Sequence, residues 1–581
     1  MSILTIPPGV SFVDSLAAGL LAETAGDPLA LSAMLVLLPT RRACRALSEA
    51  FLRQAEGRPL LLPRLQPLGD ADEDELVLAG DLDLPPAIPP LTRQLLLARL
   101  IIALGGGRDG RPPTPEQAAR LAGELGRLLD QVTTEGLSFA GLQRLVPAQL
   151  ARHWQITVDF LAILTEHWPK ILAEQGWMDA ADRRNRLLAA QAAQWDAAPP
   201  SFPVLAAGST GSIPATARLL EVIARLPAGR LVLPGLDREM SDADRAALDP
   251  GHPQWGLMRL LAGLNTAPAD VKLWPACAGG GTPRARLIAE AMRPAATTDA
   301  WRRLAGQEIE LSGLSRLDCP APREEAAVIA LMMRQALEIP ERTAALVTAD
   351  RPLARRVAAE LGRFGVDIDD SAGRPLDLTP VGSYLLLTAT MIADGFAPHA
   401  TLAALKSPLA RGGLPPGALP ARVRRLELAA LRGPRPAPGI DGLLAAIGER
   451  PELTAWLRQL QETAAPLTAL MQAPEAPLRA LLAAHLAFAE RLADTPEEAG
   501  SSILWRDEAG RAAAQYVADL ALAGENFPPL AGDAYPGLLR QLMAATTVRP
   551  TWGRHPRLAI WGPLEARLQH ADLLILGGLN E

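Results

Sequence analysis

One strand-loop-helix unit of the chain carries residues whose types and spacing could hold a phosphate group. The apolar run Val204–Ala207 is followed by a loop of small residues, Gly208–Ser212, and then by Pro214 at the expected first position of an amphipathic helix. Small residues let backbone N–H groups approach an anion at a helix N-terminus. A nucleotide site of this kind also needs a lysine that reaches the β- and γ-phosphates. The lysines of this chain are Lys170, Lys272 and Lys406. None follows a glycine, so we expect no ATP site and no catalytic residue here.

The hydroxyl groups of the loop, those of Ser209, Thr210 and Ser212, suit contacts with phosphate that carry no sequence information. An alternative is a tight turn between strand and helix in which Ser and Thr side chains cap the helix. The sequence leaves both interpretations open.

Arginines open helices after two further predicted strands. Arg41 and Arg42 follow the strand Met34–Leu38, and Arg351, Arg355 and Arg356 follow the strand Ala344–Thr348. A guanidinium group at such a position can bind phosphate oxygens through two parallel hydrogen bonds. Solvated or carboxylate-paired arginines are the alternative, which Asp350 beside Arg351 favours.

Other kinds of chemical site find little support in the sequence. The acidic run Asp70–Glu75 lacks the glycine of an EF-hand loop, so we expect a solvated or partner-facing loop and no metal site. The chain has no C-x-x-C pair, no H-E-x-x-H and no G-x-S-x-G.

Most of the tryptophan side chains are expected in hydrophobic cores, and the alternative is that some of them stack on nucleic-acid bases. The tryptophans considered are Trp154, Trp168, Trp177, Trp195, Trp255, Trp274 and Trp301.

Composition bounds the class of protein. The chain has 581 residues, of which 49% are hydrophobic, so several domains with sizeable cores are expected. The net charge of −7 argues against a histone-like coat but leaves room for a local basic groove. No apolar run of about 18 residues and no basic-then-apolar leader is present, so we expect a cytoplasmic protein without a membrane span.

The order of elements predicts two α/β halves with parallel sheets, each interrupted by a mainly helical segment. Thr114-Pro115-Glu116-Gln117 predicts a helix start within the first helical segment, and Val366–Ile368 predicts a short strand in the second half. The expected segments are 1–88 (first α/β part), 89–200 (helical), 201–310 (α/β and connector), 311–380 (second α/β half), 381–545 (helical) and 546–581 (return to the second half).

This layout resembles superfamily 1 helicases, in which two RecA-like domains each carry an inserted helical domain. Local strings add a narrower resemblance, to the AddB family of the AddAB double-strand-break repair helicase–nucleases, alphaproteobacterial type, over residues 1–581. The strings are LVLLPTRRA (35–43), RLQPLGDADEDEL (64–76), AAGSTGSIPAT (206–216), LVLPGLD (231–237), HPQWGLMRLL (252–261), ALVTADRPLARRV (345–357), DDSAGRPL (369–376) and LILGGLNE (574–581).

The resemblance implies an AddA partner that carries the ATP-driven motor and binds ATP and Mg²⁺. It implies a helicase-like subunit that handles the unwound strand, binds single- and double-stranded DNA ends and reads the Chi sequence during end resection for homologous recombination. The DNA-contact candidates that follow are Arg41, Arg42, Ser209, Thr210, Ser212, Arg351, Arg355 and Arg356. Two other functions stay open: an assembly scaffold for AddA without DNA contact, and a weak ATPase with a non-standard phosphate loop.

The sequence also departs from the family pattern. Where some members have a Walker A motif, this chain has Pro7–Asp14, with no Gly-Lys-Ser/Thr. The nuclease carboxylates of the family would lie beyond Glu581, so we expect a shortened chain without nuclease activity. Three dispersed cysteines give no reason to expect the iron–sulfur cluster of some members.

Overall fold

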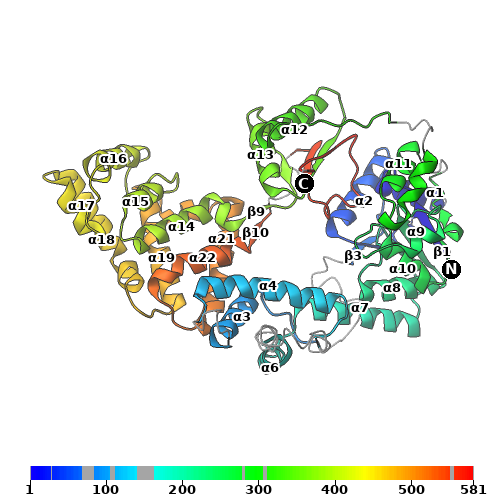
Figure 1. Cartoon of the computed structure of the whole chain (residues 1–581), viewed down its shortest axis with the longest axis horizontal. Helices are drawn as coiled ribbons and strands as arrows, with labels where there is room; N and C mark the ends of the chain where they lie inside the picture. The colour runs from blue at the N-terminus through cyan, green and yellow to red at the C-terminus, as the bar shows by residue number, and fades with distance from the viewer. Residues whose placement is uncertain are drawn as a thin grey trace.

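The computed structural model describes residues 2–25, 27, 29–68, 84–104, 112–139, 163–277, 282–304, 311–549 and 555–579. Two parallel sheets lie at one end of the molecule, and a long helical arm extends from them (Figure 1). The predicted α/β class with a parallel sheet is confirmed. In the described ranges, no helix combines the length and the apolar character needed to cross a bilayer.

The first sheet has six strands in the order β3-β2-β4-β5-β1-β6, and all neighbours run parallel. Its strands are β1 (Ser2–Ile6), β2 (Leu35–Leu38), β3 (Arg64–Pro67), β4 (Val204–Ala207), β5 (Gly229–Pro234) and β6 (Lys272–Leu273). β2 and β4 are buried along their whole length, which is why they read as continuous apolar runs and not as alternating ones. The sheet is compatible with a RecA-like domain.

Side chains of alternate residues enter two different cores on the two faces of this sheet. Leu35 and Leu37 lie in the core that includes α7 (Ala180–Ala197), α8 (Pro214–Arg225) and α10 (Trp255–Gly263). Val36 and Leu38 lie in the core that includes α1 (Phe12–Glu23) and α2 (Arg41–Gln54). Helix α7 therefore belongs with the sheet, although the predicted helical segment ran to residue 200.

The second sheet has four parallel strands in the order β12-β7-β11-β8. Its strands are β7 (Ala344–Val347), β8 (Asp369–Asp370), β11 (Leu558–Trp561) and β12 (Leu573–Leu576), and α12 (Pro322–Ala336) and α13 (Arg351–Gly362) share its core. The strand predicted at Val366–Ile368 is wrong by a few residues. The β bridge to Ala559 and Ile560 starts at Asp369, because that is where the backbone comes alongside β11.

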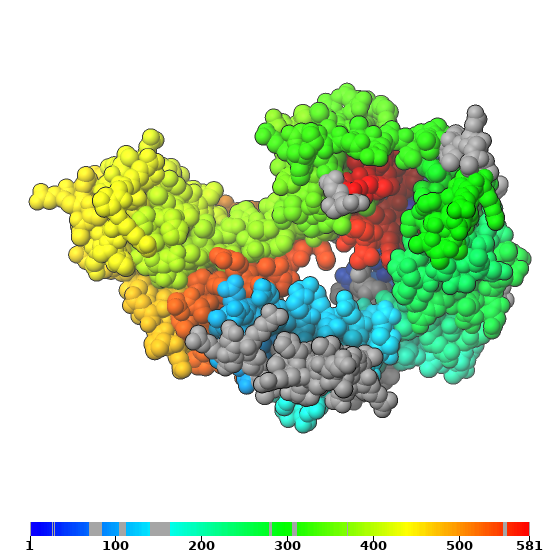
Figure 2. Space-filling model, viewed as in Figure 1, coloured from blue at the N-terminus to red at the C-terminus, as the bar shows by residue number. Residues whose placement is uncertain are grey.

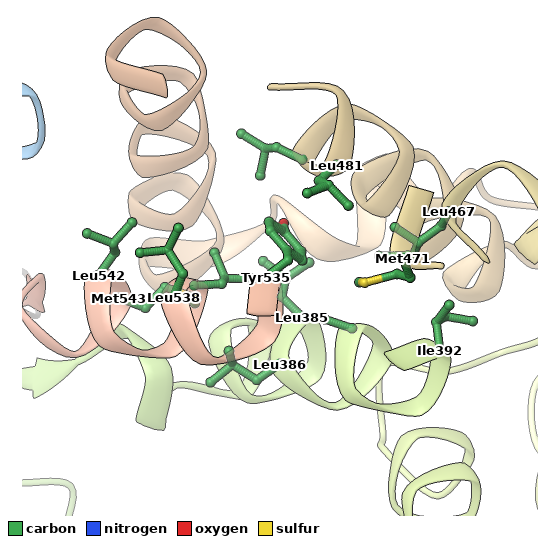
Figure 3. Packing of buried hydrophobic residues seen from close by; sticks show 14 of the residues in the cluster. Leu385, Leu386, Ile392, Leu467, Met471, Leu481, Tyr535, Leu538, Leu542 and Met543 are labelled. Atoms are coloured by element: carbon green, nitrogen blue, oxygen red, sulfur yellow. The ribbon is translucent and has the colours of Figure 1, made fainter. Parts of the chain in front are cut away.

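The helical arm contains α14 (Pro380–Ala393), α15 (Pro398–Leu405), α16 (Ala418–Leu426), the π-helix η7 (Glu427–Leu431), α17 (Gly439–Ile447), α18 (Pro451–Met471), α19 (Leu478–Ala493), α20 (Gly500–Leu504), α21 (Asp507–Ala523) and α22 (Tyr535–Ala544). Figure 3 shows apolar side chains of α14, α18, α19 and α22 pointing toward one another, with Tyr535 among them. The earlier helices α3 (Pro90–Leu104), α4 (Pro115–Thr134) and α6 (Trp168–Gln175) contribute to the same core.

That shared core was not expected from the sequence, which predicted two separate helical segments. α4 packs on α22, so residues about 400 positions apart in the chain stabilise one body. The predicted start of α4 is confirmed. Thr114 accepts a hydrogen bond from the Gln117 N–H, while the Gln117 side chain accepts one from the Thr114 N–H, which forms a capping box.

Packing of α1 gives a first testable prediction. A Cβ at Gly19 would lie 2.2 Å from Nε1 of the fully buried Trp274, whose indole N–H donates to the Ser15 carbonyl at 2.8 Å. Because the ring is held by that bond, we expect Gly19→Ala to lower the free energy of unfolding by about 1–3 kcal/mol, despite alanine's better helix propensity. Gly362→Ala, where no atom lies within 4 Å of the added Cβ, is the control and should be neutral or slightly stabilising. Urea unfolding of both variants measures the difference, and equal stability would contradict this packing.

Candidate nucleic-acid interface

The turn after β1 stands where a nucleotide-binding loop would be expected. Ser11 caps α1, and its hydroxyl donates to Asp14 Oδ2 at 2.5 Å. Arg53 of α2 donates to Asp14 Oδ1 from Nη2 at 2.7 Å and from Nε at 3.1 Å. The positive end of the α1 dipole is therefore already matched by a carboxylate of the chain itself. A phosphate group at this helix end would be repelled by Asp14.

The loop Gly208–Ser212 lies between β4 and α8, as predicted. Its two glycines have φ of +75° (Gly208) and +64° (Gly211), values that glycine adopts readily. The hydroxyls of Thr210 and Ser212 are hydrogen-bonded to each other at 2.9 Å, and the Gly211 N–H donates to Ser209 Oγ at 3.4 Å. The tight turn of the alternative interpretation is present, but no Ser or Thr side chain caps α8. The N-cap is Ile213, which has no side-chain oxygen, and Pro214 occupies the first turn.

The same loop contacts the segment that joins two strands of the second sheet. A Cβ added at Gly208 would lie 2.3 Å from Cδ1 of Leu568, a residue of the segment between β11 and β12. Leu568 also packs against the core that holds α1 and α2. The segment that leads into β12 thus contacts the carboxyl end of β4, the edge of a parallel sheet where ligands commonly bind. This contact brings the two sheets together at the predicted hydroxyl-bearing loop.

The first pair of predicted arginines lies at the start of α2. Thr40 caps this helix, and its Oγ1 accepts a hydrogen bond from the Ala43 N–H at 3.1 Å. Arg41 is exposed and Arg42 is half-buried. Both follow β2 and therefore lie at the carboxyl edge of the first sheet, on the same edge as the Gly208 loop.

The second set of arginines lies on α13, and the structure separates its members. Asp350 caps the helix through the Leu353 N–H at 3.0 Å, whereas Arg351 forms its ion pair with Asp370 of β8. The predicted carboxylate pairing of Arg351 is thus confirmed with a different partner from the adjacent Asp350. Arg355 and Arg356, one turn further along, are exposed.

Further basic side chains lie where the arm joins the second sheet, and sequence reasoning missed them. β9 (Arg374–Pro375) pairs antiparallel with β10 (Thr547–Val548), and the exposed side chains of Arg374 and Arg549 lie at this ribbon. Burial raises the pKa of Asp377 above its usual value, while backbone N–H groups and then the charges of Arg540 and Arg355 oppose that shift. Arg355 and Arg540 therefore lie near one carboxyl group, although they are far apart in the sequence.

Figure 2 shows an opening through the molecule between the sheets and the arm, bordered in this view by the segments of α4, of α22 with β10, and of the chain after β11. In Figure 1 the strands β9 and β10, which carry Arg374 and precede Arg549, lie between the helical arm and the helices α12 and α13. No local sequence pattern predicts that Arg374 and Arg549 lie close together, because each is a single basic residue in a chain rich in arginine. Only the pairing of β9 with β10 brings them together.

The tryptophans mostly serve the cores, as predicted. Trp168, Trp195 and Trp274 are buried, and Trp177 packs at the edge of the arm's core. Trp255 is half-buried and has the Arg259 guanidinium 5.1 Å from its ring centroid. Trp301 is exposed, and its indole N–H donates to the Glu290 carbonyl at 3.0 Å. Trp154 lies outside the described residues.

Among the residues that the structure describes, no group of histidine, cysteine, aspartate and glutamate is arranged to hold a metal ion. The acidic run Asp70–Glu75 lies outside the described residues. Comparison of the sequence with protein-family models and with curated proteins found no match.

Proposed function

We propose that this chain is a non-motor, helicase-like subunit that guides single-stranded DNA beside an AddA-type motor while double-strand breaks are resected for homologous recombination. In this proposal both sheets are RecA-like, and the helices between their strands are inserted domains. The six-stranded parallel sheet, a second parallel sheet and their contact through Gly208 and Leu568 support this arrangement. Reading of Chi and binding of DNA ends would follow from the AddB resemblance.

The proposal that this chain is not an ATP-driven motor rests on one observation, which is that a carboxylate of the chain itself lies at the N-terminus of α1. Asp14, held by Ser11 and Arg53, supplies negative charge where a motor would bind phosphate. No lysine precedes Lys170 in the sequence, so none is available here to reach the β- and γ-phosphates of a nucleotide. ATP and Mg²⁺ would then be bound by the AddA partner. DNA-stimulated ATP hydrolysis by this chain alone would contradict the proposal and favour a weak ATPase.

The DNA part of the proposal rests on where the basic side chains lie. Arg41 and Arg42 lie at the carboxyl edge of the first sheet, together with the Ser209 loop. Arg355 and Arg356 lie on the second turn of α13, the helix that packs on the second sheet. A strand that passed along both edges would meet guanidinium and hydroxyl groups, which bind phosphate without reading bases.

We predict that the double variant Arg355→Gln/Arg356→Gln binds single-stranded DNA about tenfold more weakly at moderate salt. The slope of log affinity against log salt should also fall by about 1.4, because each lost phosphate contact removes about 0.7 on a single strand. Fluorescence anisotropy across a salt series, with and without AddA, gives both numbers. Arg351 is left intact because its loss would leave Asp370 unpaired.

The matched control is Arg334→Gln/Arg363→Gln, which removes the half-buried Arg334 of α12 and the exposed Arg363 at the end of α13. Both are paired with glutamates, Arg334 with Glu338 and Arg363 with Glu360. The control should keep the affinity and the slope of the native chain. Equal loss in both variants would show that only net charge matters. No DNA binding by any form, with AddA binding retained, would favour the assembly scaffold.

A further inference from the structure

A cationic pocket lies in the helical arm, at the other end of the molecule from the two sheets (Figure 1). It is a cavity of about 520 Å³ between the end of α15, the following loop, α16 and η7. Its wall carries the basic side chains of Lys406, Arg411, Arg424 and Arg432. Apolar residues make up much of the remaining wall, among them the exposed Leu428.

The segment around the pocket has the opposite charge to the chain. Residues 406–435 contain seven basic residues and one acidic residue, Glu427, whereas the whole chain has a net charge of −7. Clustered charge of one sign raises the local concentration of the opposite ion. This concentration of positive charge therefore favours an anionic ligand at the arm.

The one carboxylate of the pocket is fully engaged by two of the cations. Glu427 lies at the start of the π-helix η7 and is largely buried. Lys406 Nζ lies 2.8 Å from its Oε2, and Arg432 Nη2 lies 2.8 Å from its Oε1. The hydrogen bond from Lys406, followed by that from Arg432, lowers the pKa of Glu427 and keeps it charged.

The other two cations have no counter-charge. In the described part of the chain, neither the Arg411 nor the Arg424 guanidinium makes an ion pair or a hydrogen bond. The backbone of Arg411 is fixed, because its N–H and that of Gly412 both donate to the Leu492 carbonyl. Two guanidinium groups thus line one cavity with their donors unused, and such groups bind oxyanions with two parallel hydrogen bonds.

We propose that this pocket binds the phosphodiester backbone of a nucleic acid. Beyond the pocket, Arg422 on α16 and Arg435 after η7 add further positive charge, so the surface suits an extended polyanion. Arg425 of α16 is ion-paired with Glu452 and is not counted among these groups. No aromatic side chain lines the cavity, so base stacking does not contribute and binding is independent of sequence. The site is separate from the sheet edges and does not rest on the single-strand path proposed above.

The test compares the native full-length chain with Arg411→Gln/Arg424→Gln, using fluorescent duplex DNA and a single strand of equal length. We expect the double variant to bind the form of DNA that occupies the pocket about tenfold more weakly than the native chain does. Its slope of log affinity against log salt should be smaller by roughly two if that form is a duplex, and by somewhat less if it is a single strand. A loss confined to the duplex assigns duplex backbone, and a loss confined to the single strand assigns single strand. The variant Arg355→Gln/Arg356→Gln separates this site from the sheet edges, because its effect should add to that of the pocket variant.

Two further variants make the test discriminating. Arg458→Gln/Arg479→Gln removes two exposed, ion-paired arginines of the same arm and should leave binding unchanged. Glu427→Gln removes the one negative charge of the pocket and should tighten binding severalfold, which general damage to the fold would not do. Equal effects of the pocket and control variants would overturn the proposal. So would competition by polyglutamate as strong as that by DNA, which would indicate an acidic protein partner.

Discussion

Acidification from neutral pH to about pH 4 is expected to cost the helical arm about 3 kcal/mol of stability through a single buried imidazole, that of His485. His485 is fully buried in the core of the arm, and burial lowers its pKa from 6.5 to about 4. The unfolded chain binds a proton at this side chain below pH 6.5, whereas the folded chain does not until about pH 4. The contribution of neutral His485 to the free energy of unfolding is therefore fully present above pH 6.5, and it is lost as the pH falls toward 4.

The hydrogen bonds of His485 suit the neutral ring. Nε2 lies 2.9 Å from Thr388 Oγ1, and Nδ1 lies 3.0 Å from the Tyr535 hydroxyl. The Thr388 hydroxyl directs its own proton to backbone carbonyl oxygens, so its oxygen accepts from the Nε2–H. Nδ1 then accepts the Tyr535 proton. A proton on Nδ1 would leave the Tyr535 hydroxyl without its acceptor in a fully buried place.

The measurement is urea unfolding at pH 7 and pH 5 for the native chain, for His485→Gln and for His399→Gln. At pH 5 the native chain should have lost about 2 kcal/mol through His485. His485→Gln should be less stable at pH 7 but should lose about 2 kcal/mol less on acidification. His399 is exposed, so His399→Gln should follow the native chain. Identical pH dependence of all three proteins would refute the assignment.

Replacement of Gly382 is expected to produce the second large effect. A Cβ at this position would lie 1.8 Å from the Leu376 carbonyl oxygen and 2.7 Å from the Leu376 carbonyl carbon. Both are main-chain atoms of a turn that cannot easily move. The Leu376 oxygen accepts the Thr379 hydroxyl at 2.7 Å, and the Leu376 N–H donates to the Thr546 carbonyl at 2.8 Å. This turn joins the β9–β10 ribbon to α14.

We therefore expect Gly382→Ala to lower the free energy of unfolding by about 2–3 kcal/mol, even though alanine favours helix by about 1 kcal/mol. Gly123→Ala in α4 is the matched control. The nearest atom to its added Cβ is a Gln94 side-chain nitrogen at 3.6 Å, so this change should stabilise the chain slightly. Urea unfolding gives both values, and hydrogen exchange should show the lost protection in α14 and in the paired ribbon. Unchanged protection there would contradict the geometry of the turn.

Local signals in the sequence predicted much of the secondary structure. The apolar runs of β2 and β4 identified buried parallel strands, because both faces of such a sheet are covered. Thr114 and Gln117 identified the start of α4, and Pro214 that of α8, because capping depends on residues only a few positions apart. The prediction failed at β8, a two-residue strand whose pairing with β11 no local pattern encodes.

The candidate interface was predictable only in part. Residues at the ends of parallel strands, such as Arg41 and Ser209, could be placed at one sheet edge from the strand pattern alone. The sequence allowed a carboxylate-paired Arg351 and offered the adjacent Asp350 in support, whereas the carboxylate that pairs with it is Asp370 of β8. Arg374, Arg540 and Arg549 were missed because their proximity depends on an antiparallel ribbon between segments about 170 residues apart.

The sequence by itself determined the buried strands β2 and β4, the start of α4 and the lack of a lysine for a phosphate loop, since these follow from residue type and short spacing. Only the tertiary structure decided the strand order that places β1 between β5 and β6, the common core of α3, α4 and the later helices, and the contact of Leu568 with Gly208. It also decided that Arg411 and Arg424 share one cavity without a counter-charge. These features arise from packing between distant segments, and the free energy of such packing depends on apolar area and charge brought together across the whole chain.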